Sequence, residues 1–153
     1  MEQAENPLST MSDQSRHLVV FTLGAEHYGL PIQQVHEIIR YVKPREVASR
    51  VEWVRGVISL RGRILPVFDL AARLGVRCEP GDQAKIVIVE SGSETAGVIV
   101  DDVEEVLTVG PEQIEDVPGA DSALIDAVAK LGERLVVLLK PCAISATAEA
   151  AAL

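Results

Sequence analysis

The sequence predicts an all-β protein made of two small barrels of about five strands each. Two observations lead to this fold class. Short segments rich in Val, Ile and Leu alternate with Gly and Pro along the chain, a pattern that is typical of small β-barrels and not of helical bundles. The chain also repeats itself, because a segment of its first half aligns without a gap on a segment 68 positions later.

The repeat joins residues 19–39 to residues 87–107, and six of the 21 aligned positions are identical. The identical pairs are Val19 with Val87, Gly24 with Gly92, Glu26 with Glu94, Gly29 with Gly97, Val35 with Val103 and Glu37 with Glu105. At an offset of 71, "LRGRILPVF" (60–68) aligns on "LGERLVVLL" (131–139), and each of these segments predicts a hairpin with a glycine in its turn. We therefore expect a duplication in which each half supplies the strands of one barrel.

The predicted domain spans residues 17–144 and lies between two tails. Residues 1–16 are polar and predict a flexible N-terminal tail, and residues 145–153 are an Ala-rich C-terminal tail. The first barrel covers about 17–75 and the second about 82–144, with termini that can exchange between them.

Two segments need a separate decision between helix and strand. "DLAARLG" predicts a short helix, because Asp69 is a good N-cap and Gly75 a good C-terminal stop. Residues 120–132 are rich in helix formers, but their second part aligns on the predicted strand "GVISLRG". We predict a strand from about Leu124, because tertiary context overrides local propensity.

Composition argues against several kinds of partner. The formal charge is −9 and the pI is near 4.8, which disfavours nucleic acid and anionic lipid as partners. The chain has no apolar run of membrane-spanning length and no signal peptide, so we expect a cytoplasmic protein without direct membrane insertion. Cys78 and Cys142 lack the spacing of a zinc site and suit a reducing compartment.

The residues predict no catalytic, cofactor or metal site. His17, His27 and His36 are the three histidines, and none follows or precedes a plausible nucleophile in a recognisable motif. The acidic run at 101–105 lacks the spacing of a calcium loop, so we interpret it as a solvated face. A single turn glycine in "LRGR" is too little for a phosphate-binding loop.

Glu37 and Arg61 are the two charged residues with a predicted structural role. Each is flanked by apolar residues and needs a partner if it is partly buried. We predict an ion pair between Glu37 and Arg61. It would join the segment "VHEII" (35–39), which crosses over to the next part of the chain, to the predicted hairpin around Arg61. The alternative is that Arg61 only extends from a hairpin tip into water, and we interpret Arg63 as solvated.

Four segments in order resemble the CheW family of chemotaxis coupling proteins. They are "YGLPIQQVHEIIR", "WVRGVISLRGRILPVFDLAARLG", "AGVIVDDVEEVL" and "LGERLVVLLKP", and the resemblance covers about residues 16–144. It implies two intertwined five-stranded SH3-like barrels with a few short helices. Ser59 stands where the family motif usually has Asn.

The resemblance also implies a non-enzymatic adaptor without cofactors. Its expected partners are the cytoplasmic tip of methyl-accepting chemoreceptors and the regulatory domain of a CheA-type histidine kinase, in signalling arrays at the membrane. The chain is expected to be a monomer in isolation. The matching receptor-groove positions are Val35, Gly56, Arg61, Ile86 and Val103. The kinase contact is expected around Val19 and Ile32 on the first barrel.

Three alternatives stay open at this point. The first is a CheW-like adaptor of a pilus-motility or other receptor-kinase pathway. The second is a small sensor barrel in which Arg61 holds an anionic metabolite. The third is a hydrolase, for which the sequence shows no triad or metal set.

Overall fold

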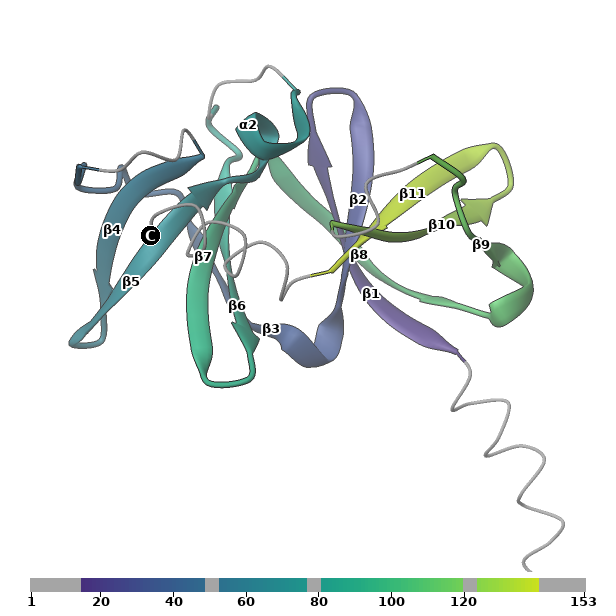
Figure 1. The fold of residues 1–153 in the computed structure, drawn as a ribbon, viewed down its shortest axis with the longest axis horizontal. Coiled ribbons are helices and arrows are strands. Elements are labelled where there is room, and N and C mark those ends of the chain that lie inside the picture. The colour runs from purple at the N-terminus through teal and green to yellow at the C-terminus, as the bar shows by residue number, and fades with distance from the viewer. Residues whose placement is uncertain (1–14, 49–52, 77–80, 120–123, 141–153) are drawn as a thin grey trace, which may run out of the picture.

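The computed structural model describes residues 15–48, 53–76, 81–119 and 124–140, which form two curved β-sheets (Figure 1). The first half contains β1 (Arg16–Leu23), β2 (Glu26–Pro31), a 3₁₀ turn η2 (Ile32–Gln34), β3 (Val35–Arg40), β4 (Val54–Leu60), β5 (Arg63–Asp69) and the helix α2 (Leu70–Leu74). The second half contains β6 (Lys85–Ser91), β7 (Glu94–Val100), β8 (Asp102–Val109), a 3₁₀ turn η3 (Pro111–Gln113), β9 (Ile114–Glu115), β10 (Ile125–Leu131) and β11 (Arg134–Leu139). The predicted all-β fold with short helices is confirmed.

The two halves of the chain exchange strands. One sheet has the order β8-β1-β2-β11-β10-β9 and the other has the order β3-β6-β7-β5-β4. Each sheet therefore contains strands from both halves, and the two-residue β9 makes the first sheet six-stranded. The boundaries 17–75 and 82–144 mark the halves of the repeat, whereas neither sheet follows them. This is the intertwining, with exchange between barrels, that the family resemblance implied.

The strand pairing repeats in the two sheets with the offsets seen in the sequence. Phe21 pairs with Val103 in one sheet, and the equivalent Val89 pairs with Val35 in the other. Both pairings have a bulge next to this position, in β8 in the first case and in β3 in the second. We call β3 and β8 the crossover strands. The parallel pairings β2–β11 and β5–β7 are equivalent in the same way. The predicted duplication is therefore present in the register of the hydrogen bonds as well as in the sequence.

The central core belongs to both sheets. Its buried side chains come from β1, β2, β5, α2, β6, β7 and the start and end of the β10–β11 hairpin. Phe21, Leu30, Leu70 and Val98 are among the most buried of them. A smaller cluster fills each sheet by itself. Because the largest cluster takes residues from both halves, we expect the halves to fold together.

The predicted helix after Asp69 and the predicted strand near residue 124 are both present. The Asp69 side chain accepts a hydrogen bond from the backbone N–H of Ala72 at 3.1 Å, and α2 ends at Gly75, whose φ of +77° lies in the left-handed region. The described part of the 120–132 segment contains the strand β10, whereas residues 120–123 lie outside the described residues.

Gly56 occupies a place in β4 that no side chain could fill. Its φ is +145°, and a Cβ atom would lie 2.0 Å from the carbonyl oxygen of Arg45. That carbonyl accepts a hydrogen bond from the backbone N–H of Val57. Arg45 and Val57 form an isolated β-bridge on the outer edge of β4, so the two backbones lie close together beside Gly56. The glycine is required by this backbone contact.

We expect Gly56→Ala to destabilise the protein by about 3 kcal/mol or more, because both the backbone conformation and the Arg45 carbonyl would have to move. Chemical denaturation followed by the fluorescence of Trp53 measures this change. Gly81→Ala is the matched control, because a Cβ at Gly81 would meet open space. Equal stabilities of the two variants would contradict the assigned role of Gly56.

Candidate functional site

The β4–β5 hairpin turns through Arg61 and Gly62, which both have positive φ angles, of 51° and 81°. This is the pattern of a type I′ turn, which matches the twist of the flanking strands. Arg61 is the only non-glycine residue with positive φ in the described ranges. The equivalent position in the second half is Gly132, which needs no such strain. The chain therefore keeps an arginine where glycine would fit the backbone better.

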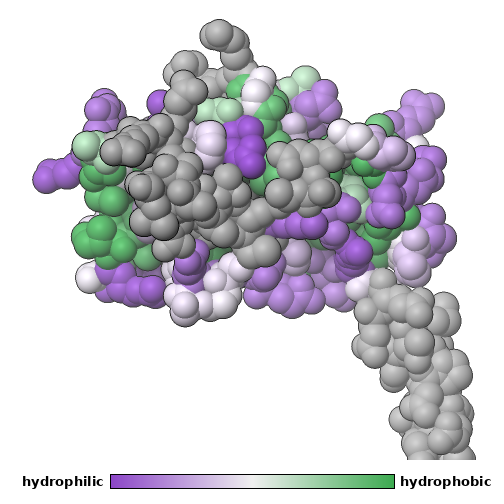
Figure 2. All heavy atoms as spheres, viewed as in Figure 1, coloured by the Kyte–Doolittle hydropathy of each residue, from purple (hydrophilic) through white to green (hydrophobic). Residues whose placement is uncertain are grey.

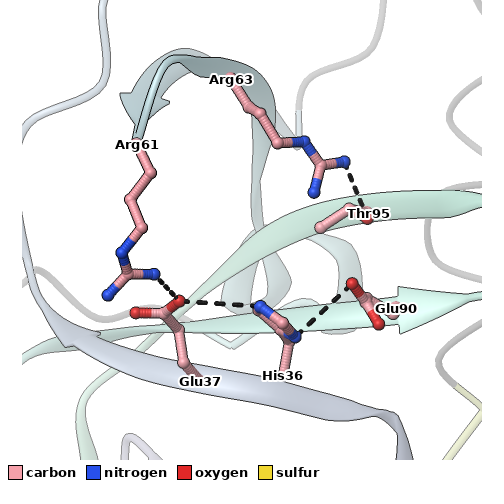
Figure 3. A network of polar contacts seen from close by, with 6 residues as sticks. All are labelled: His36, Glu37, Arg61, Arg63, Glu90 and Thr95. Atoms are coloured by element: carbon pink, nitrogen blue, oxygen red, sulfur yellow. Dashed lines mark hydrogen bonds and ion pairs between the residues drawn. The ribbon is translucent and has the colours of Figure 1, made fainter.

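The side chain of Arg61 reaches back to the crossover strand (Figure 3). Its Nη1 donates to Oε1 of Glu37 on β3, which is the ion pair that the sequence predicted. Glu37 is 21% exposed and Arg61 is 70% exposed, so the guanidinium is both paired and in contact with solvent. Arg63, on the other arm of the turn, is exposed and lies 3.4 Å from the Thr95 hydroxyl.

The hydrogen bond from Arg61 is the main reason why the pKa of Glu37 lies below its ordinary value. Partial burial opposes this shift, while the charges of Arg61 and His36 add to it. The same hydrogen bond raises the pKa of Arg61. Glu37 therefore remains ionised throughout the neutral range.

The second half has an equivalent pair with a different arginine. Glu105 corresponds to Glu37, and its Oε2 lies 2.8 Å from Nη1 of Arg134 on β11. Arg134 corresponds to Arg63, which stands on the opposite arm of the turn from Arg61. Each crossover glutamate is thus tied to its own hairpin, but only the first half uses an arginine at the hairpin tip.

Of the five predicted groove positions, Val35, Val103 and Arg61 have side chains that a partner can reach. Val35 on β3 and Val103 on β8 are partly buried against the central core that the two sheets share. Val35 stands next to the Glu37–Arg61 pair, on the other side of the bulge in β3. The family resemblance assigns Val35, Val103 and Arg61 to one groove, and we call these three residues together with Glu37 the junction surface.

Ile86 and Gly56 do not form part of this surface, which corrects the prediction. Ile86 is 0% exposed, because it lies in the middle of the five-stranded sheet and packs into the core of that sheet. The sequence could not show this, since "KIVIVES" is apolar at consecutive positions and gives no alternation to separate inside from outside. Gly56 is buried and serves the backbone contact with Arg45.

The predicted kinase-binding residues also differ in exposure. Ile32 in η2 is 37% exposed and stands beside a pocket of about 280 Å³, lined in part by Pro31 and Gln33. Val19 is 2% exposed within β1, so its side chain cannot contact a partner, and the prediction is wrong for this residue. The alternation along β1 is hidden by the continuous apolar run "LVVF", which is buried on both faces.

Several contacts were not predicted from the sequence. Arg55 binds the Asp69 carboxylate through Nε at 2.8 Å and Nη2 at 2.5 Å, so Asp69 holds the β4–β5 hairpin as well as capping α2. The guanidinium of Arg73 lies over the Trp53 ring at 5.0 Å. These contacts depend on the register of β4 against β5, which a single sequence does not reveal.

Exposed apolar side chains also recur at equivalent positions. Ile38 corresponds to Val106 in the crossover strands, and Ile64 corresponds to Leu135 in the hairpins; all four are at least 39% exposed. Figure 2 shows apolar residues gathered at the end of the molecule where β4 and β5 lie. Each barrel therefore presents a similar apolar surface to solvent.

The described residues contain no group of three or more His, Cys, Asp or Glu side chains that could hold a metal ion. Cys78 and Cys142 lie outside the described residues. None of the helices within the described ranges has the length and apolar character needed to cross a membrane.

Comparison with known proteins decides the family. A family model described as the CheW-like domain matches residues 17–149. The chain belongs to this family.

Characterised relatives and a solved structure agree with the assignment to the CheW-like family. The chain is 33% identical to the chemotaxis protein CheW of Klebsiella aerogenes over 129 residues, which cover 81% of this chain and 78% of that protein. It is 34% identical to CheW of Bacillus subtilis over 102 residues, covering 66% and 65% of the two chains. The crystal structure of the scaffolding protein TtCheW from Thermoanaerobacter tengcongensis matches with a TM-score of 0.77 and 36% identity, covering 82% of this chain and 84% of that one.

The Glu37–Arg61 pair predicts a pH-dependent contribution to stability. Folding lowers the pKa of Glu37 below its ordinary value of 4.5, so the pair stabilises the protein fully at pH values above 4.5. This contribution is lost as the pH falls through the lower pKa of the folded state. We expect Glu37→Gln to be less stable than wild type at pH 7 and the difference to shrink below pH 4.5.

The measurement is the free energy of unfolding in denaturant between pH 3 and pH 7. Glu26→Gln, which changes an exposed glutamate in the β1–β2 hairpin, is the matched control. A difference between wild type and Glu37→Gln that stays constant across this range would contradict the pairing.

Proposed function

We propose that this CheW-like protein is a non-enzymatic adaptor of chemotaxis signalling that couples chemoreceptors to a CheA-type histidine kinase. The family match over most of the chain carries this proposal. Its activity would be thermodynamic: a protein that binds receptor and kinase together lets the state of one alter the state of the other.

The junction surface is the proposed site for the receptor tip. Val35 and Val103, both packed on the shared core, would supply apolar contacts, and the exposed guanidinium of Arg61 would supply a positive charge. An amphipathic helix that carries apolar anchors and one carboxylate would fit such a surface. The strained backbone of Arg61 supports this role, because a glycine at the same position would serve the turn alone.

The kinase regulatory domain is proposed to bind elsewhere on the chain. Ile32 remains a candidate contact, since it is exposed on η2, the turn that leads into β3. The repeated apolar surfaces around Ile64 and Leu135 suit contacts between barrels in an array at the membrane, where many modest contacts add up through avidity.

We expect Val35→Asp and Arg61→Ala to weaken binding of a receptor-tip fragment by about 5- to 20-fold, corresponding to about 1–2 kcal/mol, because each removes a direct contact. Binding of the kinase regulatory domain should not change. Isothermal titration calorimetry with each partner measures both affinities.

Ile32→Asp is the reciprocal variant. It should weaken binding of the kinase regulatory domain and leave binding of the receptor fragment unchanged. If every folded variant loses affinity for both partners, or if none loses affinity for either, the proposed division of surfaces is wrong.

Arg61→Gly separates recognition from turn geometry. Glycine relieves the positive φ angle, so we expect Arg61→Gly to be more stable than Arg61→Ala by about 1 kcal/mol. Both variants should nevertheless lose receptor affinity equally, because both lack the guanidinium. Recovery of receptor affinity in Arg61→Gly would show that Arg61 serves only the turn.

A further inference from the structure

His36 stands at the bulge of β3 between Val35 and Glu37, and its ring faces carboxylates from two strands (Figure 3). Its Nδ1 lies 3.5 Å from Oε2 of Glu90 on β6, and its Nε2 lies 3.9 Å from Oε1 of Glu37. The side chains of His36 and Glu90 are 48% and 45% exposed, so protons reach them freely. Histidine is the side chain that most readily changes charge near neutral pH, and a proton on His36 would change the charge of this cluster.

The Glu37 oxygen that faces His36 is the oxygen that accepts the hydrogen bond from Arg61. The charged groups around His36 are therefore Glu37 on its own strand, Glu90 on β6 and Arg61 on the β4–β5 turn. A neutral imidazole exerts little pull on either carboxylate. A protonated one attracts both and competes with the guanidinium for the shared oxygen.

We propose that His36 is a proton-operated clamp which, when protonated, bridges Glu37 and Glu90 and loosens the bond between Glu37 and Arg61. The clamp needs Glu37 ionised throughout the titration of the imidazole, and the lowered pKa of that carboxyl provides this. Release from Glu37 leaves the exposed guanidinium of Arg61 available to a carboxylate of a bound partner. This consequence for binding rests on the proposed function, while the clamp itself involves only residues of this chain.

The other sheet supplies a matched control. His27 on β2 lies 3.2 Å from Oε1 of Glu104 on β8, and Arg134 on β11 lies 3.7 Å from the same oxygen. This second cluster also joins a histidine, a carboxylate and an arginine. It contains none of the residues of the His36 cluster, so titration of His27 should leave Arg61 unaffected.

The clamp is tested in the free protein by NMR. The histidine ring signals and the Nε–H signal of the Arg61 side chain are followed from pH 5 to pH 8.5 in wild type, His36→Gln and His27→Gln. We expect the Arg61 signal to move with the His36 titration in wild type and His27→Gln, and to stay constant in His36→Gln. An Arg61 signal that ignores pH, or that moves equally in His36→Gln, would overturn the clamp.

The consequence for binding is tested with a receptor-tip fragment at pH 6 and pH 8. We expect wild type and His27→Gln to bind about two- to fivefold more tightly at pH 6, and His36→Gln to show no such difference. Equal pH dependence in His36→Gln and wild type would overturn the link to binding. A fragment that fails to bind at either pH would refute the proposed receptor site, and the NMR titration would still decide the clamp.

Discussion

The exchange of strands between the two halves of the chain is the constraint on which the rest of the structure depends. The parallel pairings β2–β11 and β5–β7 place strands from both halves in each sheet, and the largest apolar core takes residues from both. Neither half can bury its apolar faces by itself, so the barrels form one unit with a fixed relative position. That fixed position holds Val35 and Val103, from opposite halves, against the same core.

The duplication makes the two barrels alike, and the differences between them concentrate in the polar groups around the crossover strands. Both crossover glutamates bind a hairpin arginine, but Arg61 stands at the hairpin tip with a strained backbone while Gly132 takes the equivalent place. His36 likewise corresponds to Glu104. The similar backbones of the two barrels therefore carry different polar groups, and only the first barrel has an arginine at the hairpin tip.

The sequence predicted the fold well because glycines, turn residues and the repeat are local or periodic signals. The cap at Asp69 and the strand β10 followed from such signals, and the Glu37–Arg61 pair followed from two charged residues with apolar neighbours. Exposure was harder to predict, and Val19 and Ile86 lie in continuous apolar runs that do not distinguish a surface strand from a buried one. The contacts of His36 were missed for a related reason, since Glu90 meets it only through the β3–β6 register.

Simultaneous binding of the two proposed partners is the decisive measurement for an adaptor. The protein would be saturated with the kinase regulatory domain and then titrated with a receptor-tip fragment, with complex mass followed by sedimentation velocity. We expect a ternary complex, because the junction surface and the exposed Ile32 are proposed as sites for two different partners. Displacement of the kinase domain by the receptor fragment would contradict coupling through a shared adaptor.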